Sequence, residues 1–165
     1  MDSTTDPGNN AHREAKYSLK ALVHLATLEP GATTQAMEIA QAHNIPKKFL
    51  DAILGDLRNA GIVFSKKGPG GGYMLARAPN DIKIGQVIRT MDGPLAPIPC
   101  ASRTAYRPCR DCKSVKSCTI RLTMAKVRDA MSGVLDQLTI ADMVAQSDGS
   151  NVALLKRRSS RRTAG

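Results

Sequence analysis

The four cysteines of this chain all fall in one segment that is rich in proline and arginine. Thiolates are soft ligands, and clustered cysteines bind zinc or iron–sulfur clusters. The segment has little apolar content of its own, so a bound metal would supply the order that packing cannot supply. We therefore predict a metal or redox site built from Cys100, Cys109, Cys112 and Cys118.

The residues around the cysteines do not select the metal. Basic residues crowd the segment from Arg103 to Arg128 and should lower the pKa values of the thiols, which favours metal binding and oxidation alike. We favour an iron–sulfur cluster of two or four irons. Structural zinc and a metal-free thiol switch are the alternatives, because ligand type alone does not decide between metals.

The sequence contains no evident catalytic constellation. Cys109 and Cys112 form a CxxC pair, the spacing that thiol oxidoreductases use, but no thioredoxin-like βαβ pattern surrounds it. The histidines His12, His24 and His43 are scattered and are interpreted as structural or solvated residues. We therefore predict that the protein is not an enzyme, and a thiol oxidoreductase is the weaker alternative.

The charge balance indicates a polyanionic partner. Lys and Arg number 24 against 14 Asp and Glu, which gives a formal net charge of +10. Double-stranded DNA is preferred to RNA, because aromatic residues make up only 3% of the chain and base stacking needs them; a zinc-stabilised RNA-binding protein is the rival. A membrane-spanning run, a lipidation motif and a secretory signal are all missing, which predicts a cytoplasmic protein that binds no membrane.

The apolar pattern predicts a mainly α fold with a small β-hairpin wing: a winged helix-turn-helix domain over residues 13–93, followed by a long dimerisation helix. Helical spacing covers 15–28, then a short helix capped by Thr33 or Thr34, then 46–57 with Gly61 at its end. Two β-prone runs, 62–66 and 72–76, flank the turn KGPGGG. A further helix is expected over 84–91.

The outward residues of the third helix and of the wing are the candidate DNA contacts. An inward apolar stripe leaves Lys47, Lys48 and Asp51 outward, where lysine reaches phosphate or guanine and aspartate accepts from cytosine. A solvated helix face is the alternative interpretation. Glycine in the wing allows close approach of the backbone to DNA. The predicted wing contacts are Lys66, Lys67, Gly68, Pro69, Gly70 and Gly71.

The C-terminal half predicts a dimer. Residues 94–119 form the cysteine-rich loop, and residues 120–146 form a dimerisation helix with a short helix after it. Apolar residues recur at alternating intervals of four and three, which is the heptad spacing of a helix that packs against another helix. The segments 1–12 and 147–165 are predicted to be disordered. The predicted seam consists of Ile120, Met124, Val127, Met131, Val134 and Leu138.

The stretch from Ile45 to Cys100, with its wing GPGGGY and the following DGPLAP, resembles the Rrf-two family of winged-helix transcriptional regulators. The resemblance covers about residues 15–145. It implies a homodimer that binds a partly palindromic DNA operator through the third helix and the wing. We predict a repressor whose operator affinity is controlled by a cluster at the cysteines or by their redox state.

The resemblance also implies a ligand set for the cluster-binding members, which use three cysteines in this loop. Cys112 and Cys118 have the spacing of the second and third ligands, and Cys100 would be the first; Cys109 is an additional thiol that could replace Cys112 or act as a fourth ligand. Three further positions bear on the resemblance. Arg121 stands where some members carry a histidine ligand, and Asp51 stands where the recognition helix usually has glutamate. In other members an acidic residue near the second subunit's N-terminus completes the site, and Glu14 is the candidate here.

Overall fold

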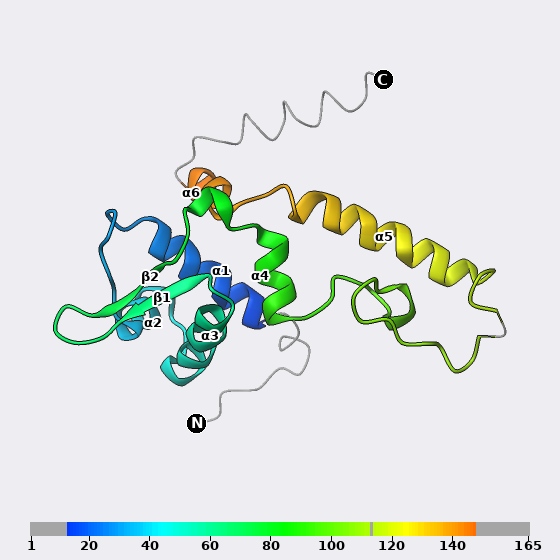
Figure 1. Cartoon of the computed structure of the whole chain (residues 1–165), viewed down its shortest axis with the longest axis horizontal. Helices are drawn as coiled ribbons and strands as arrows, with labels where there is room; N and C mark the ends of the chain where they lie inside the picture. Colours follow the sequence, from blue (N-terminus) through cyan, green and yellow to red (C-terminus); the bar gives the residue numbers. More distant parts are fainter. Residues whose placement is uncertain (1–12, 113, 148–165) are drawn as a thin grey trace, which may run out of the picture.

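The structure is a computed structural model that describes residues 13–112 and 114–147 (Figure 1). Its N-terminal part packs three helices together: α1 (Arg13–Ala26), α2 (Ala36–His43) and α3 (Lys47–Asn59). The turn between α2 and α3 is made by Asn44, which caps α2 in the left-handed conformation with a φ of 51°. Asparagine tolerates this conformation better than most residues do. The predicted helix-turn-helix is therefore confirmed.

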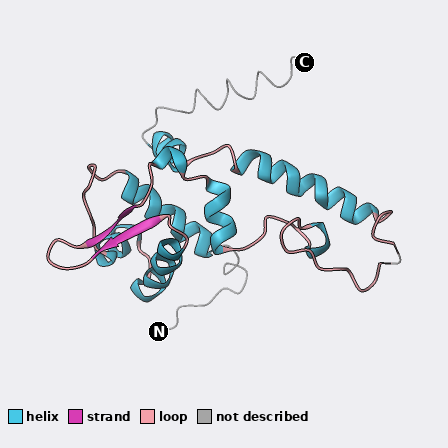
Figure 2. Ribbon diagram, in the orientation of Figure 1, coloured by secondary structure: helices cyan, strands magenta, loops and turns pink. Residues whose placement is uncertain are grey.

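The wing is an antiparallel hairpin of β1 (Val63–Lys66) and β2 (Gly72–Leu75), in which Phe64 lies opposite Met74 (Figure 2). It is held to the rest of the domain by a backbone bridge between Thr34, just before α2, and Tyr73 of β2. Gly72 makes this close approach possible, because a Cβ atom there would lie 2.4 Å from the carbonyl oxygen of Thr34. The wing thus has a fixed position beside the helix-turn-helix.

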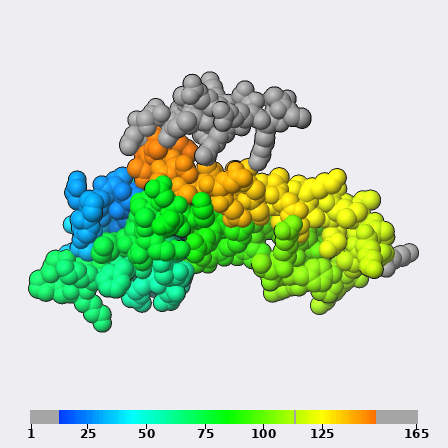
Figure 3. Space-filling model, turned by 45° about the horizontal axis from the view of Figure 1, so that its top comes forward, coloured from blue at the N-terminus to red at the C-terminus, as the bar shows by residue number. Residues whose placement is uncertain are grey.

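In the second half of the chain, α4 (Ile84–Met91) and α6 (Ile140–Ser147) pack with the N-terminal helices, whereas the loop between α4 and α5 (Thr119–Leu135) and α5 itself extend away from them. A short 3-10 helix, η2 (Pro79–Asp81), leads into α4, which has the predicted bounds. The loop that follows carries η3 (Pro99–Ala101) and ends at α5. In Figures 1 and 3, α5 and this loop form a second lobe that extends to one side of the winged helix. The last helix, α6, packs against α1.

One hydrophobic core holds the winged helix together. Leu22 of α1, Ile39 of α2, Leu54 of α3, Val87 of α4 and Ile140 of α6 all have 0% exposure. Each large aliphatic side chain buried in this way stabilises the fold by about 1.5–3 kcal/mol. Because the buried residues of α3, Leu54 among them, lie on one side of that helix, its opposite side faces solvent.

Three local predictions differ from the structure. The N-cap of α2 is Gln35, whose backbone N–H donates to the Glu38 carboxylate at 2.9 Å, and not Thr33 or Thr34. Helix α5 ends at Leu135, so Leu138 of the predicted seam lies beyond it and packs against the core. Residue 147 ends α6 and does not begin the tail; the predicted disordered segments 1–12 and 148–165 lie outside the described residues.

Candidate DNA interface and cysteine loop

The N-terminal half of α3 presents charged side chains to solvent. Lys47, Lys48 and Asp51 are exposed, whereas Leu50 and Leu54 on the opposite side of the helix are fully buried. The Lys47 Nζ lies 2.6 Å from Asp51 Oδ2, with about half of each side chain exposed. Such a pair adds little stability. Its consequence is positional, because Asp51 holds the Lys47 ammonium close to the helix surface.

The wing tip is a tight turn with accessible backbone. Residues 66–70 are exposed, and the Gly71 N–H closes the turn by donating to the Gly68 carbonyl at 2.9 Å. A Cβ atom at Gly71 would lie 2.4 Å from the Lys66 carbonyl oxygen, so only glycine fits there. The Thr33 hydroxyl donates to the Gly70 carbonyl at 2.9 Å. The tip is therefore fixed to the segment before α2.

An aromatic pair supports α3 from α1 and adds a cation that the sequence analysis missed. The rings of Tyr17 and Phe49 meet edge to face, with centroids 5.7 Å apart. The Arg13 guanidinium lies over both rings, 5.8 Å from the centroid of Tyr17 and 5.5 Å from that of Phe49. Stacking of arginine on an aromatic face restrains the charge. Phe49 directly follows Lys48, so Arg13 belongs to the same region.

Two of the scattered histidines meet in the folded chain. His43, in the last turn of α2, places its Nε2 atom 3.2 Å from Nδ1 of His24 in the last turn of α1. Burial lowers the pKa of His43, and the nearby charges of His24 and Lys20 lower it further. His43 directly precedes the turn into α3. The two histidines lie far apart along the chain, and no local pattern signals their contact.

Cys112 and Cys118 meet at the N-terminus of α5, and Cys109 interacts with Cys112. The Cys112 thiol donates to the sulfur of Cys118 at 3.7 Å, and the Cys109 thiol donates to the Asp111 carboxylate at 3.6 Å. Cys118 is the N-cap of α5. Two thiolates bound to one tetrahedral metal at about 2.3 Å each lie about 3.8 Å apart, so Cys112 and Cys118 are spaced as two such ligands would be.

The same contacts give the two thiols opposite acidities. The hydrogen bonds that Cys112 makes with Cys109 and Cys118 raise its pKa to about 12. The backbone N–H of Arg121 and then the Cys112 thiol donate to Cys118 and lower its pKa. The arginine-rich surroundings were predicted to lower thiol pKa values in general. For Cys112 the proximity of other sulfur atoms dominates, and for Cys118 the backbone at the helix N-terminus contributes more than the charge of Arg121 does.

Cys100 occupies a different setting. It is buried in η3, and none of the described sulfur contacts involves it. Two arginines of α5 hold its backbone: the Arg121 Nε donates to the Cys100 carbonyl at 3.0 Å, and Arg128 donates to the carbonyl of Ala101. Arg121 therefore serves as an anchor for η3. These two contacts could not be predicted from the sequence, since they depend on how the loop lies along α5.

The ligand chemistry of the cysteines suits a metal, but their arrangement in a single chain does not bring all four together. They are soft ligands, and Cys112 and Cys118, at the N-terminus of α5, already have ligand-like spacing. Within residues 13–112 and 114–147, however, no three His, Cys, Asp or Glu side chains are gathered closely enough to hold a metal ion. In a single chain, the four predicted cysteine ligands are thus divided: Cys100 lies in η3, and Cys109, Cys112 and Cys118 lie in the segment that leads into α5. Glu14 is exposed in the first turn of α1.

Residues 11–146 match the family model named Rrf2, which is described as an iron-dependent transcriptional regulator. The chain belongs to the Rrf2 family. An HTH-type transcriptional regulator of Rhodobacter capsulatus, named as Rrf2-like, is 46% identical over 136 residues, covering 81% of this chain and 91% of the relative.

Solved structures agree with the Rrf2 assignment. CymR, described as the global cysteine regulator of Bacillus subtilis, superposes with a TM-score of 0.66 at 30% identity and covers 81% of this chain and 95% of its own. The structure of T. potens IscR gives a TM-score of 0.64 at 28% identity and covers 86% of this chain and 90% of its own. The predicted family and winged-helix fold are therefore confirmed.

The Rrf2 assignment defines the class of function. Its members and the matching relatives are transcriptional regulators and not enzymes, as predicted, and the class implies DNA binding. No helix in the described part of the chain is both long and apolar enough to cross a membrane. The individual DNA contacts and metal ligands remain predictions for this Rrf2 protein.

Proposed function

We propose that this protein is a homodimeric repressor that binds a partly palindromic DNA operator through α3 and the wing. The observation that carries the proposal is the exposed charged face of α3 over a buried apolar stripe, beside a wing tip with accessible backbone. Lysines at 47, 48, 66 and 67 neutralise phosphates, and Asp51 adds an acceptor for a cytosine amino group. Gly68, Pro69, Gly70 and Gly71 bring the wing backbone to the sugar–phosphate chain.

The apolar seam of α5 supports the dimer. Ile120, Val127, Met131 and Val134 are 65%, 40%, 39% and 52% exposed, and α5 has no buried residue in the single chain. A helix with such a seam is stabilised by packing against a second helix. Pairing of two α5 helices would set the distance between two α3 helices, which must match one turn of DNA, about 34 Å.

Control by the cysteine loop is the second part of the proposal. Cys112 and Cys118, with Cys100 and Cys109 as the other candidates, would hold an iron–sulfur cluster, with Glu14 of a second subunit as a further candidate ligand. The bound cluster would supply redox and ligand-exchange chemistry. The protein's own contribution is mechanical: Arg121 and Arg128 tie η3 to α5, so that a change at the cysteines moves the loop and the dimer helix together.

A metal-free thiol switch is the second candidate, and one distance favours it. The sulfur atoms of Cys112 and Cys118 are 3.7 Å apart, so a small shift would bring them to the about 2.05 Å of a disulfide. Forming that bond releases two protons and two electrons to an oxidant such as a peroxide. Structural zinc would use the same thiolates without redox change.

The deciding experiment is anaerobic purification followed by an absorption spectrum and assays of iron, sulfide and zinc on one sample. Visible charge-transfer bands with matching iron and sulfide would support the cluster. Colourless protein that stays free of iron after reconstitution would exclude it, and the zinc assay together with thiol counting before and after peroxide then separates zinc from the thiol switch.

Operator binding is tested on the same preparations with Cys112→Ser and Cys118→Ser. Both substitutions should abolish the difference in DNA affinity between the loaded or reduced protein and the stripped or oxidised protein. Ser114→Ala, in the same loop, is the matched control and should keep that difference. If the cysteine variants respond as the wild type does, the loop does not control DNA binding, whereas the interface proposal for α3 stands.

A further inference from the structure

A pocket of about 260 Å³ lies where α4, the loop after η3 and α5 meet. It is at the junction of the two lobes seen in the space-filling view (Figure 3). Its walls come from the DNA-binding domain on one side and from the cysteine loop and the dimer helix on the other. The polar side chains that line it are Arg89, Ser102, Arg103, Thr104, Arg128, Ser132 and Asp136.

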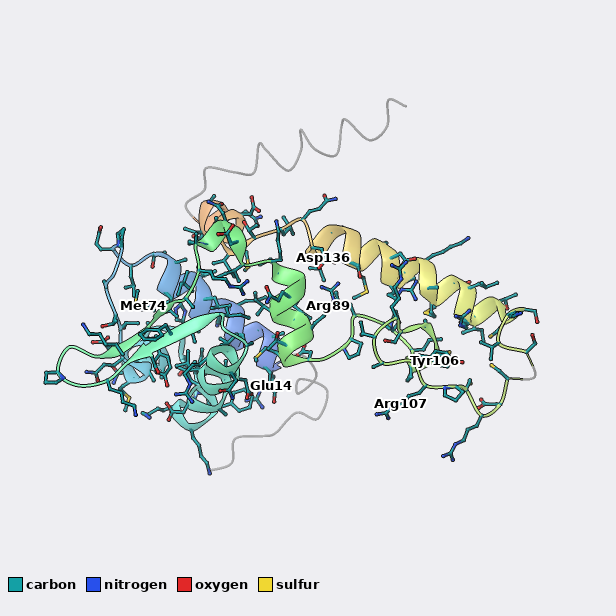
Figure 4. The ribbon with its side chains drawn as sticks, in the orientation of Figure 1. Glu14, Met74, Arg89, Tyr106, Arg107 and Asp136 are labelled. Atoms are coloured by element: carbon teal, nitrogen blue, oxygen red, sulfur yellow. The ribbon has the colours of Figure 1, made fainter. Side chains whose placement is uncertain are left out.

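The pocket carries excess positive charge, because its lining residues include three guanidinium groups and only one carboxylate. Arg89 and Asp136 point toward one another between α4 and α5 (Figure 4) and form a two-point pair, with N···O distances of 2.6 and 2.8 Å. The Arg89 guanidinium also approaches the Ser132 hydroxyl at 3.4 Å. Asp136 thus occupies the side of Arg89 that a bound anion would occupy.

The other two arginines are held by a carboxylate outside the pocket. Arg128, whose side chain is only 14% exposed, contacts Asp129 at 2.8 Å and donates to the Ala101 carbonyl. Arg103 contacts the same carboxylate at 3.0 Å, with 72% of its side chain exposed. A guanidinium has five N–H donors, and these contacts leave donors of both residues for a further acceptor. Ser102 and Thr104 add hydroxyl groups to the lining.

We propose that this pocket binds a small anion that carries its charge on oxygen atoms, in the class of phosphate, sulfate and short dicarboxylates. Arginine matches the geometry of such groups by donating two parallel hydrogen bonds. A volume of about 260 Å³ suits a ligand below the size of a nucleotide. The bound anion competes with Asp136 for Arg89 and draws Arg103 and Arg128 toward the same centre.

The position of the pocket gives the anion a regulatory effect. Arg89 belongs to α4 of the DNA-binding domain, whereas Arg128 lies on α5 and holds η3, which contains Cys100. A ligand that contacts both lobes alters the angle between them, and by linkage operator binding then alters ligand affinity by the same factor. This regulatory step rests on the proposed operator binding, while the binding site itself does not.

The binding site is tested by calorimetric titration of the full-length protein with inorganic phosphate, sulfate and succinate at constant ionic strength. We expect saturable binding of one anion per chain. Arg103→Gln should weaken it by about tenfold through loss of a charge-assisted hydrogen bond. Asp136→Asn should tighten it by about threefold or more, because it removes the competing carboxylate. A purely structural role of Asp136 would give the opposite sign.

Lys126→Gln is the matched control, since it removes one positive charge from the exposed surface of α5 outside the pocket. Its affinity for the anion should equal that of the wild type. Absence of saturable binding by all three probes would overturn the proposal, as would equal weakening by Lys126→Gln and Arg103→Gln. Operator titrations with and without the bound anion then test regulation. Unchanged DNA affinity would exclude the regulatory step. If the wild type does not bind DNA at all, the proposed function is refuted, while the anion-binding site stands.

Discussion

The backbones of Thr34 and Tyr73 bind each other in both directions: the Thr34 N–H donates to the Tyr73 carbonyl at 3.1 Å, and the Tyr73 N–H donates to the Thr34 carbonyl at 2.8 Å. This bridge holds the wing against the start of the helix-turn-helix. It depends on Gly72, which leaves room for the Thr34 carbonyl. Together with the hydrogen bond from Thr33 to Gly70, this bridge is a point at which the relative position of the two proposed DNA-contacting elements is determined.

Gly72→Ala should loosen that point. The added methyl group would lie 2.4 Å from the Thr34 oxygen, and we expect a loss of about 1–3 kcal/mol in the free energy of unfolding together with weaker operator binding. Urea denaturation and DNA titration measure the two effects. Gly55→Ala, in α3 with open space around it, is the control and should stabilise by about 0.5–1 kcal/mol. Equal stability of Gly72→Ala and wild type would contradict the role of the bridge.

Lys48→Gln should weaken operator binding and lower its salt dependence. If Lys48 neutralises one phosphate, the slope of log affinity against log salt should fall in magnitude by about 0.9. Titrations of operator and unrelated DNA at several salt concentrations provide the measurement. Lys83→Gln is the control, because Lys83 is also exposed but stands before α4, where its backbone bridges to Thr139. The same loss of slope in both variants would show a general charge effect and not a contact through α3.

Val127→Asp should separate the dimer. The substitution places a charge in the centre of the exposed seam of α5, and burying that charge against a second helix without a partner costs several kcal/mol. Analytical ultracentrifugation should show a monomer, and affinity for a palindromic operator should fall more than affinity for a half-site. Lys126→Asp, on the exposed surface beside the seam residue, should stay dimeric. A dimeric Val127→Asp protein would place the subunit interface elsewhere.

Acid should destabilise the fold through His43. Burial lowers the pKa of His43, so near pH 6.5 the unfolded chain binds more protons than the folded chain does. The free energy of unfolding therefore rises with pH in this range and falls as the pH drops below about 7, with a slope of at most about 1.4 kcal/mol per pH unit for one histidine. Urea denaturation between pH 5 and pH 8 measures the slope at this order of magnitude. His43→Gln should flatten the dependence, and an unchanged slope in that variant would assign it to other groups.

The local sequence pattern was enough to predict the helices and strands of the fold. The apolar stripe of α3, the bounds of α4 and the glycine-rich turn between two β-prone runs follow from the periodicity of the chain and from backbone preferences of glycine. The outward position of Lys47, Lys48 and Asp51 follows from the same stripe, because residues opposite a buried stripe must face solvent. The end of α5 was misplaced, since Leu138 has the seam spacing but is held by the core.

The sequence by itself therefore determined the winged helix, its exposed cationic face and the concentration of thiols before the long helix, because each depends on residues that are neighbours along the chain. Only the tertiary structure decided which distant groups meet. His24 reaches His43, Arg89 reaches Asp136, and Cys100 is held apart from the sulfur contacts that join Cys112 to Cys118. Such contacts depend on the packing of whole helices and loops against one another, and no spacing within a single segment records that packing.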